Sequence, residues 1–300
     1  MTAGLTQPQA SNWSARLADY LSLTKPAIVA LLLLTTLCGM VVALGRIPPW
    51  STLALTLLGG GLTAGGAGAL NQYVDRGIDR RMVRTMRRAL PDNRLRPQAG
   101  LLFGLAMSAA GLAVLAFGVN PLSSILALAG ILYYAVLYSI LLKPSTPQNI
   151  VVGGGAGAIP PLVGWAAATG SLSLPAFFLF AVIFFWTPPH FWALALLKRS
   201  DYARAGIPML PVVSGEAETH RQILLYSLQV VALTILLPLV GLGGGFFLLA
   251  AVLLGFGLFR HAWILLRRGG NRFAWKMYRY SSLYLAGIFL ALAVDALLIG

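Results

Sequence analysis

The sequence predicts an all-α, polytopic membrane protein with nine transmembrane helices. Of its 300 residues, 58% are hydrophobic and only 10% are charged, and the mean hydropathy is +0.80. These values lie outside the range of water-soluble domains. A spanning helix needs about 20 mostly apolar residues, and the chain contains nine such segments. The lipid bilayer is therefore an expected partner, and the core is expected to lie against lipid and neighbouring helices.

The predicted spans follow one another with short connections. Glycine and proline occur within several of them, but both residues are common in membrane helices. The seventh and eighth spans are separated only by "GLGGG", so the boundary between them is the least defined. In order, the spans are 26–45, 51–70, 99–118, 121–142, 149–169, 174–197, 222–242, 244–266 and 278–299.

The Lys and Arg residues predict the orientation of the bundle. With nine spans, every one of them except Arg46 falls on or beside the face that carries the N-terminus. Positive residues concentrate on the cytoplasmic side, which predicts a cytoplasmic N-terminus and an outer C-terminus. Residues 1–25 show no cleaved signal peptide or transit peptide, so we expect a cytoplasmic segment over 1–25, a single domain over 26–300 and a bacterial plasma (inner) membrane location.

The net charge of +14 does not indicate a nucleic-acid-binding protein. The bases lie between apolar segments and form no continuous basic domain, so no nucleic-acid partner is expected. The single cysteine, Cys38, lies inside an apolar run and is interpreted as a packing residue. It excludes a disulfide framework and a thiolate metal site.

The stretch "NQYVDRGIDR" (71–80) places scarce acids at the end of the second span. If the helix continues past Leu70, Asn71, Asp75 and Asp79 share one face, because residues four apart are helical neighbours. An amide and two carboxylates suit Mg²⁺, which takes few protein ligands and completes its shell with water and phosphate oxygens. The arginines that follow suit phosphate oxygens. Together they predict a metal-bridged polyphosphate site.

The alternative is a helix end whose charges only set membrane topology. That reading is reasonable for the arginines, which contribute to the positive-inside pattern. It is weaker for the two aspartates, since carboxylates contribute little to topology and ionisable groups at membrane depth usually have a function.

A second cluster, "KRSDYARAGIPMLP" (198–211), follows the sixth span on the same face. It contains Asp201, with Lys198 three residues earlier. Its glycine and prolines predict a stiff, non-helical turn. Asp201 alone is also compatible with a helix cap or a pair with Lys198, but two clusters of acids and bases on one face favour a shared site.

The two clusters resemble the signature regions of the UbiA superfamily of intramembrane prenyltransferases. They resemble most narrowly its protoheme IX farnesyltransferase (heme O synthase) branch. The stretches "TPQNIVVGGGAGAIPPLVGWAAATG" (146–170) and "WTPPHFWALAL" (186–196) are similar to the same branch. The resemblance covers residues from about 20 to 290. It implies a nine-helix bundle around a lipid-accessible cavity, in agreement with the count of spans.

The resemblance also implies roles for individual residues. Asn71, Asp75 and Asp79 would form the first Mg²⁺ motif and Asp201 would open the second, while Arg84, Arg88 and Lys198 would bind diphosphate. Many superfamily members carry another aspartate four residues after Asp201, where this chain has Ala205. The heme branch generally shows this form. Without this aspartate, the number of metal ions, one or two, stays open. A second ion would be held through water or Asn71.

The implied reaction transfers a farnesyl group from farnesyl diphosphate to a vinyl group of heme B, with addition of water, to give heme O. A terminal oxidase or a downstream heme-modifying enzyme is the expected recipient. The histidine after Pro188 and Pro189, His190, is a further candidate. A neutral imidazole suits iron ligation or acceptance of a proton from water, and a hydrogen bond to a neighbouring helix remains the structural alternative.

Two other functions share parts of this pattern. Prenyl transfer to a quinone precursor would use the same diphosphate site but predicts an acid at position 205, where Ala205 stands. A transporter would predict acids at mid-depth or repeated halves. The sequence shows no clear repeat, and Asp295 is the only acid deep in the terminal helix.

Overall fold

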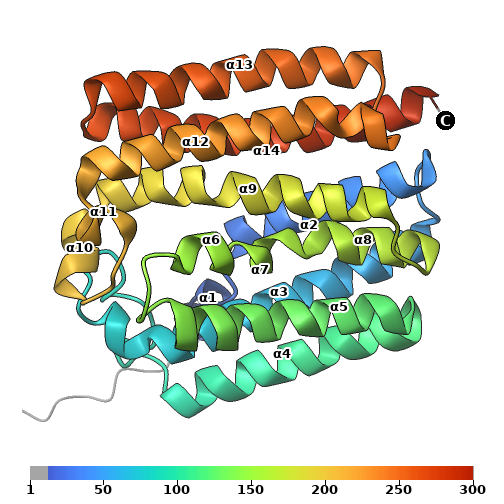
Figure 1. The fold of residues 1–300 in the computed structure, drawn as a ribbon. Coiled ribbons are helices and arrows are strands. Elements are labelled where there is room, and N and C mark those ends of the chain that lie inside the picture. The colour runs from blue at the N-terminus through green and yellow to red at the C-terminus, as the bar shows by residue number, and fades with distance from the viewer. Residues whose placement is uncertain (1–12, 300) are drawn as a thin grey trace, which may run out of the picture.

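The computed structural model describes residues 13–299, and within that range every regular element is helical. Nine helices of this part of the chain are long and apolar enough to cross a membrane, which confirms the predicted number and the all-α class. They run roughly parallel and antiparallel in one bundle (Figure 1). The spans are Pro26–Leu44, Trp50–Asp79, Pro97–Gly118, Pro121–Leu142, Asn149–Thr169, Leu174–Leu197, Gly215–Val240, Gly245–Arg268 and Asn271–Ile299.

Four of the spans are single helices whose ends differ little from prediction. These are α2 (Pro26–Leu44), α4 (Pro97–Gly118), α9 (Leu174–Leu197) and α13 (Gly245–Arg268). Helix α9 continues through Pro188 and Pro189. Three helices are longer than their apolar runs: α3 (Trp50–Asp79), α12 (Gly215–Leu236) and α14 (Asn271–Ile299). Each extra length carries polar residues, which hydropathy alone assigns to connections.

Two spans are built from pieces. The fourth begins as α5 (Pro121–Leu132) and continues as a π-helix, η1 (Tyr133–Leu142). The fifth consists of α6 (Asn149–Gly153), α7 (Gly155–Ala158) and α8 (Pro160–Thr169). In the fifth span, the glycine-rich residues 153–157 and Pro160 account for the breaks, because glycine is flexible and proline lacks an amide hydrogen. The seventh span ends in a 3₁₀ turn, η2 (Leu237–Val240).

Three short helices lie outside the spans. Helix α1 (Trp13–Leu23) falls in the predicted N-terminal segment, whose residues 1–12 are outside the described range. Helices α10 (Arg199–Arg204) and α11 (Leu210–Val213) lie at one end of the bundle, and the C-terminal end of α14 lies at the opposite end (Figure 1). The turn predicted over residues 206–211 is non-helical through residue 209, but Leu210 and Pro211 already belong to α11.

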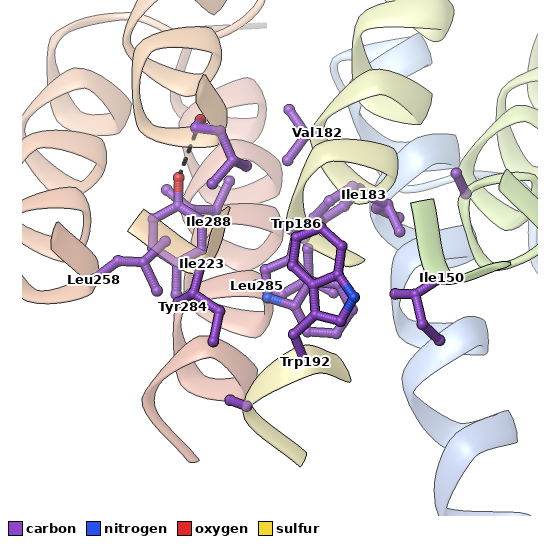
Figure 2. Packing of buried hydrophobic residues seen from close by; sticks show 14 of the residues in the cluster. Ile150, Val182, Ile183, Trp186, Trp192, Ile223, Leu258, Tyr284, Leu285 and Ile288 are labelled. Atoms are coloured by element: carbon purple, nitrogen blue, oxygen red, sulfur yellow. Dashed lines mark hydrogen bonds between the residues drawn. The ribbon is translucent and has the colours of Figure 1, made fainter. Parts of the chain in front are cut away.

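A hydrophobic core joins the later helices of the bundle. Figure 2 shows Trp186 and Trp192 of α9 beside Ile223 of α12 and Tyr284 of α14. Tyr284 is fully buried, and its hydroxyl lies 2.8 Å from the Thr234 hydroxyl. Apolar packing and a satisfied polar pair therefore fix α14 against α9 and α12, which positions the wall of the site described below.

Close contact between α2 and α8 depends on a glycine. A Cβ atom added at Gly164 would lie 2.1 Å from the backbone oxygen of Thr36. Both atoms belong to helix interiors, so the contact can be relieved only by moving one helix away from the other. Small residues commonly allow such close packing in membranes.

We therefore expect Gly164→Ala to destabilise the protein by about 1–3 kcal/mol, the usual cost of overpacking. Thermal unfolding of the protein purified in detergent would measure the loss. Gly77→Ala is the matched control, because no atom lies within 4 Å of a Cβ added to this exposed helical glycine. Equal unfolding temperatures for the two variants would contradict the close contact.

Candidate active site

A cavity of about 640 Å³ lies inside the bundle between α2, α3, α9, α14 and the pieces of the fourth and fifth spans. Most of its wall is apolar, with residues such as Leu32, Val163 and Leu285. Its polar end lies where α3 reaches Asp79. One space therefore combines an apolar body with a charged end.

The continuation of α3 past Leu70 is confirmed, and it places Asn71, Asp75 and Asp79 in the cavity wall. All three are buried, with exposures of 3%, 3% and 2%. They occupy one face of α3 because each is four residues from the next.

The buried carboxylates of α3 are paired with basic side chains. Lys143 Nζ donates to Asp75 Oδ2 at 2.6 Å, and Arg88 Nη1 donates to Asp79 Oδ2 at 2.8 Å. Asn71 Nδ2 also donates to Asp75 Oδ2, at 2.9 Å. The other oxygen of Asp75, Oδ1, is buried and has no hydrogen-bond partner in the described part of the chain. Such an oxygen has unused capacity for a ligand.

Lys25 closes the other side of this network. Its Nζ donates to Asn71 Oδ1 at 2.5 Å and to the Tyr134 hydroxyl at 3.0 Å. The backbone of Lys25 is left-handed, with φ 54° and ψ 61°, just before Pro26 starts α2. A residue other than glycine is uncommon in this conformation, and such strain concentrates at functional sites. The turn directs the lysine back toward α3.

The π-helix η1 supplies the remaining partners of α3. At its end, the backbone N of Lys143 donates to the backbone oxygen of Tyr138 at 2.8 Å, five residues earlier. The Ser139 hydroxyl donates to the backbone oxygen of Tyr134 at 2.7 Å. Ser139 accepts from Asn71 Nδ2 at 2.7 Å. Segments of π-helix are rare and frequently lie at functional sites. Here the segment places a serine, a lysine and two cavity-lining tyrosines opposite one face of α3.

The connection after α3 adds Arg84 and Arg88 to the cavity wall, as predicted. Tyr202 of α10 lies beside Arg84 in the same wall and is buried. Burial raises the pKa of Tyr202, and the positive charge of Arg84 opposes part of that rise. The phenol therefore stays protonated at neutral pH and is available as a hydrogen-bond donor.

Asp201 and Lys198 are the two predicted site residues that do not line this cavity. Asp201 is buried, pairs with Arg204, and lies 3.4 Å from the backbone N of Val83. It therefore joins α10 to the connection after α3, directly behind Tyr202. Lys198 ends α9 and is partly exposed. Their roles in binding stay predictions.

His190 lines the cavity from α9 and is held by α14. Its Nδ1 lies 2.8 Å from the Ser281 hydroxyl, which itself donates to the backbone oxygen of Tyr278 at 2.8 Å. A hydroxyl has one proton to donate, so in this arrangement the ring must donate from Nδ1. The neutral ring then carries its free lone pair on Nε2. The ring is stacked between Trp186 and Tyr278, with centroid distances of 4.3 and 4.6 Å.

Residues 32–292 match the family model described as the UbiA prenyltransferase family. The chain belongs to the UbiA prenyltransferase family. The match includes seven spans in full and most of the first and the ninth, so the predicted resemblance is confirmed.

Curated relatives are similar over nearly the full chain. A protoheme IX farnesyltransferase of Chloroflexus aurantiacus is 52% identical over 299 residues, which cover 100% of this chain and 51% of the relative. One of Roseiflexus castenholzii is 52% identical, covering 93% and 52%. One of Azotobacter vinelandii is 49% identical, covering 92% and 93%. The chain thus spans about half the length of the first two relatives.

Solved structures share the fold at low sequence identity. A structure of a digeranylgeranylglyceryl phosphate synthase has a TM-score of 0.78 and 18% identity, covering 94% of this chain and 99% of that chain. A UbiA homolog from Archaeoglobus fulgidus, bound to GPP and Mg²⁺, has a TM-score of 0.62 and 17% identity, covering 91% and 99%. These likenesses establish the UbiA-type arrangement of nine helices.

Four residues that line the cavity were not predicted from the sequence: Lys25, Tyr138, Lys143 and Tyr202. Lys25 and Lys143 each follow or precede a span, where a lone lysine indicates only topology. Tyr138 lies among apolar residues with no distinctive spacing, whereas Tyr202 directly follows Asp201 inside the second charged cluster, which was a signal for it. The short connection around Lys143 was a second signal, because a charge placed there must lie near the membrane end of the second span.

We expect Lys143→Met to destabilise the protein by about 3 kcal/mol, because it leaves the Asp75 carboxylate buried without its cation. The double variant Lys143→Met/Asp75→Leu should recover most of this loss, since it removes both charges. A double-mutant cycle on thermal unfolding in detergent measures the coupling. Additive effects of the two single substitutions would mean that the buried pair contributes nothing.

Proposed function

We propose that the protein transfers a farnesyl group from farnesyl diphosphate to a vinyl group of heme B, with addition of water, to give heme O. The main observation behind this proposal is that one cavity has a polar end with buried carboxylates and cations and a body that is apolar. The names of relatives about 50% identical to the chain support heme as the acceptor.

The charged end of the cavity fits a diphosphate. Lys25, Arg84, Arg88 and Lys143 all line it, and guanidinium groups bind phosphate oxygens through paired hydrogen bonds. Tyr202 adds a neutral donor from α10. As the allylic carbon–oxygen bond breaks, its electron pair goes to the diphosphate, and these side chains stabilise the growing charge.

The donor set at the same end fits a hard cation. Asp75 has an unpartnered buried oxygen, and Asn71 and Asp79 lie one turn on either side of it. These three residues would hold Mg²⁺, and bound Mg²⁺ supplies Lewis-acid neutralisation of the diphosphate oxygens. No group of three carboxylate, histidine or cysteine side chains suited to a metal occurs within residues 13–299, so phosphate and water oxygens would complete the shell. Asp201, behind Tyr202, remains a candidate for a second ion through water, and Lys198 for diphosphate.

The apolar body of the cavity excludes bulk water from the farnesyl chain and the allylic cation. The vinyl group attacks that cation and forms a carbon–carbon bond. Water then adds to the cation left beside the porphyrin ring and loses a proton to give the hydroxyl. The free Nε2 lone pair of His190 suits acceptance of that proton. It suits ligation of the heme iron equally well.

The placement of charge also supports the proposed setting. The segments that carry most of the bases lie at the end of the bundle that holds α10 and α11 (Figure 1), which favours a cytoplasmic N-terminus and an outer C-terminus. The bacterial relatives support the bacterial inner membrane as the location. Residues 26–300 form the single catalytic domain and residues 1–25 the cytoplasmic segment. A terminal oxidase or a heme-modifying enzyme is the proposed recipient of the product.

The decisive experiment incubates the protein purified in detergent with heme B, farnesyl diphosphate and Mg²⁺. Mass spectrometry should detect a heme that has gained one farnesyl group and one water. Product on a phenolic acceptor and none on heme would replace this proposal with prenyl transfer to a quinone precursor.

In that assay, Asp75→Asn should lower turnover roughly a hundredfold or more, because the buried oxygen then offers no negative charge to a metal ion. Asp201→Asn tests the proposed second motif in the same way. Asp92→Asn is the matched control: Asp92 is half-exposed and pairs with Arg94 away from the cavity. Near-normal activity of folded Asp75→Asn would place the metal elsewhere.

The role of His190 is resolved by His190→Ala with two readouts. If Nε2 accepts the proton, turnover should fall while the absorption spectrum of bound heme B stays unchanged. If Nε2 ligates iron, the spectrum should change as well. Unchanged turnover and spectrum would leave only the hydrogen bond to Ser281 and a packing role for the ring.

A further inference from the structure

A second, smaller cavity of about 210 Å³ lies between α13 and α14, near the basic end of the bundle. Arg260, Ile264 and Arg268 line it from one face of α13, since they are four residues apart. Phe273 and Lys276 line it from α14. The larger cavity of the candidate active site uses the other face of α14, where Tyr278 and Ser282 lie, so the two cavities are separate.

The geometry of the two helices builds this smaller cavity. The absence of a side chain at Gly257 of α13 leaves room for Tyr280 of α14, since a Cβ atom at position 257 would lie 1.9 Å from the tyrosine hydroxyl. Tyr280 in turn stacks on His261, which completes the lining. The charged groups of Arg268 and Lys276 lie 5.8 and 6.0 Å from the centre of the Phe273 ring. An aromatic side chain thus holds two cations at the rim.

The cations of this cavity have no acidic partner in the described part of the chain. Each ion pair within residues 13–299 involves bases at position 221 or earlier. None of the eight acidic residues falls within 260–279, whereas six bases do: Arg260, Arg267, Arg268, Arg272, Lys276 and Arg279. Three like charges around one small cavity repel one another, and a bound anion would relieve that repulsion.

An exposed apolar track leads to the same cavity. Leu249, Leu253 and Phe256 precede Arg260 on one face of α13, at spacings of four, three and four residues. Their exposures are 61%, 64% and 67%. Arg260 lies about 12 Å from the end of the helix at Arg268, and a long arginine side chain can extend its charged group toward the head-group region. A charged head group and an acyl chain would therefore meet the protein along a single face.

We propose that this cavity binds the phosphate head group of an anionic phospholipid from the leaflet at the basic end of the bundle. Arg260, Arg268 and Lys276 contact the phosphate, and an acyl chain lies along Leu249, Leu253 and Phe256. Basic pockets between membrane helices suit such head groups. A free phosphate compound offers the same charge but leaves the apolar track uncovered. The inference is independent of the proposed reaction.

Native mass spectrometry of the detergent-purified protein tests the site. The probes are phosphatidylglycerol and phosphatidylcholine with the same acyl chains. We expect wild-type protein to retain phosphatidylglycerol roughly tenfold better. The variant Arg260→Gln/Arg268→Gln/Lys276→Gln should lose this preference. The control Arg267→Gln/Arg272→Gln/Arg279→Gln removes the same charge from the same hairpin outside the cavity and should keep it.

If both triple variants lose the preference for phosphatidylglycerol equally, general attraction to the charged surface would replace the proposed site. If both keep the preference, the proposed site is wrong. Competition by inorganic phosphate or glycerol phosphate at lipid-equivalent concentrations would replace the lipid with a free phosphate compound. The single substitutions Arg260→Gln and Lys276→Gln, each expected to lose part of the preference, decide the matter if the triple variant does not fold.

Discussion

The buried polar network of Lys25, Asn71, Asp75 and Lys143 is the interaction on which the site depends. It joins the start of α2, the last turns of α3 and the end of the fourth span through contacts of 2.5–2.9 Å. Charges this deep in a membrane protein are stable only when they are paired. The network therefore fixes the start of α2 and the end of the fourth span against α3, and these segments form the charged wall of the cavity.

The same network gives the cavity two chemically different ends. Apolar helix faces line the body, while the paired charges and Tyr202 line the mouth near α10. An allylic diphosphate has the same division, with an apolar chain and a charged head. In the proposed reaction, ionisation at such a boundary would release charge toward fixed cations and leave the reactive carbon away from water. The fold would then separate stabilisation of the leaving group from protection of the cation.

Irregular backbone is concentrated around this boundary. The π-helix η1, the broken fifth span and the left-handed Lys25 all lie in the cavity wall. In a membrane such backbone is tolerated where protein or a cavity satisfies it, and not where lipid surrounds it. The regular helices α4, α12 and α13 expose much of their surface, as does the fourth span outside its cavity-lining face. Their exposed faces are free to contact lipid, as the track on α13 does.

The sequence by itself determined the number of spans, the basic end and the carboxylate face of α3. Apolar length, charge distribution and four-residue spacing are properties of the chain alone. Only the tertiary structure decided that Lys25 and Lys143 pair with α3, because their partners are 46 and 68 residues away. It likewise placed His190 against Ser281 and set Asp201 behind the cavity wall. Those contacts depend on how the helices pack, which no local pattern encodes.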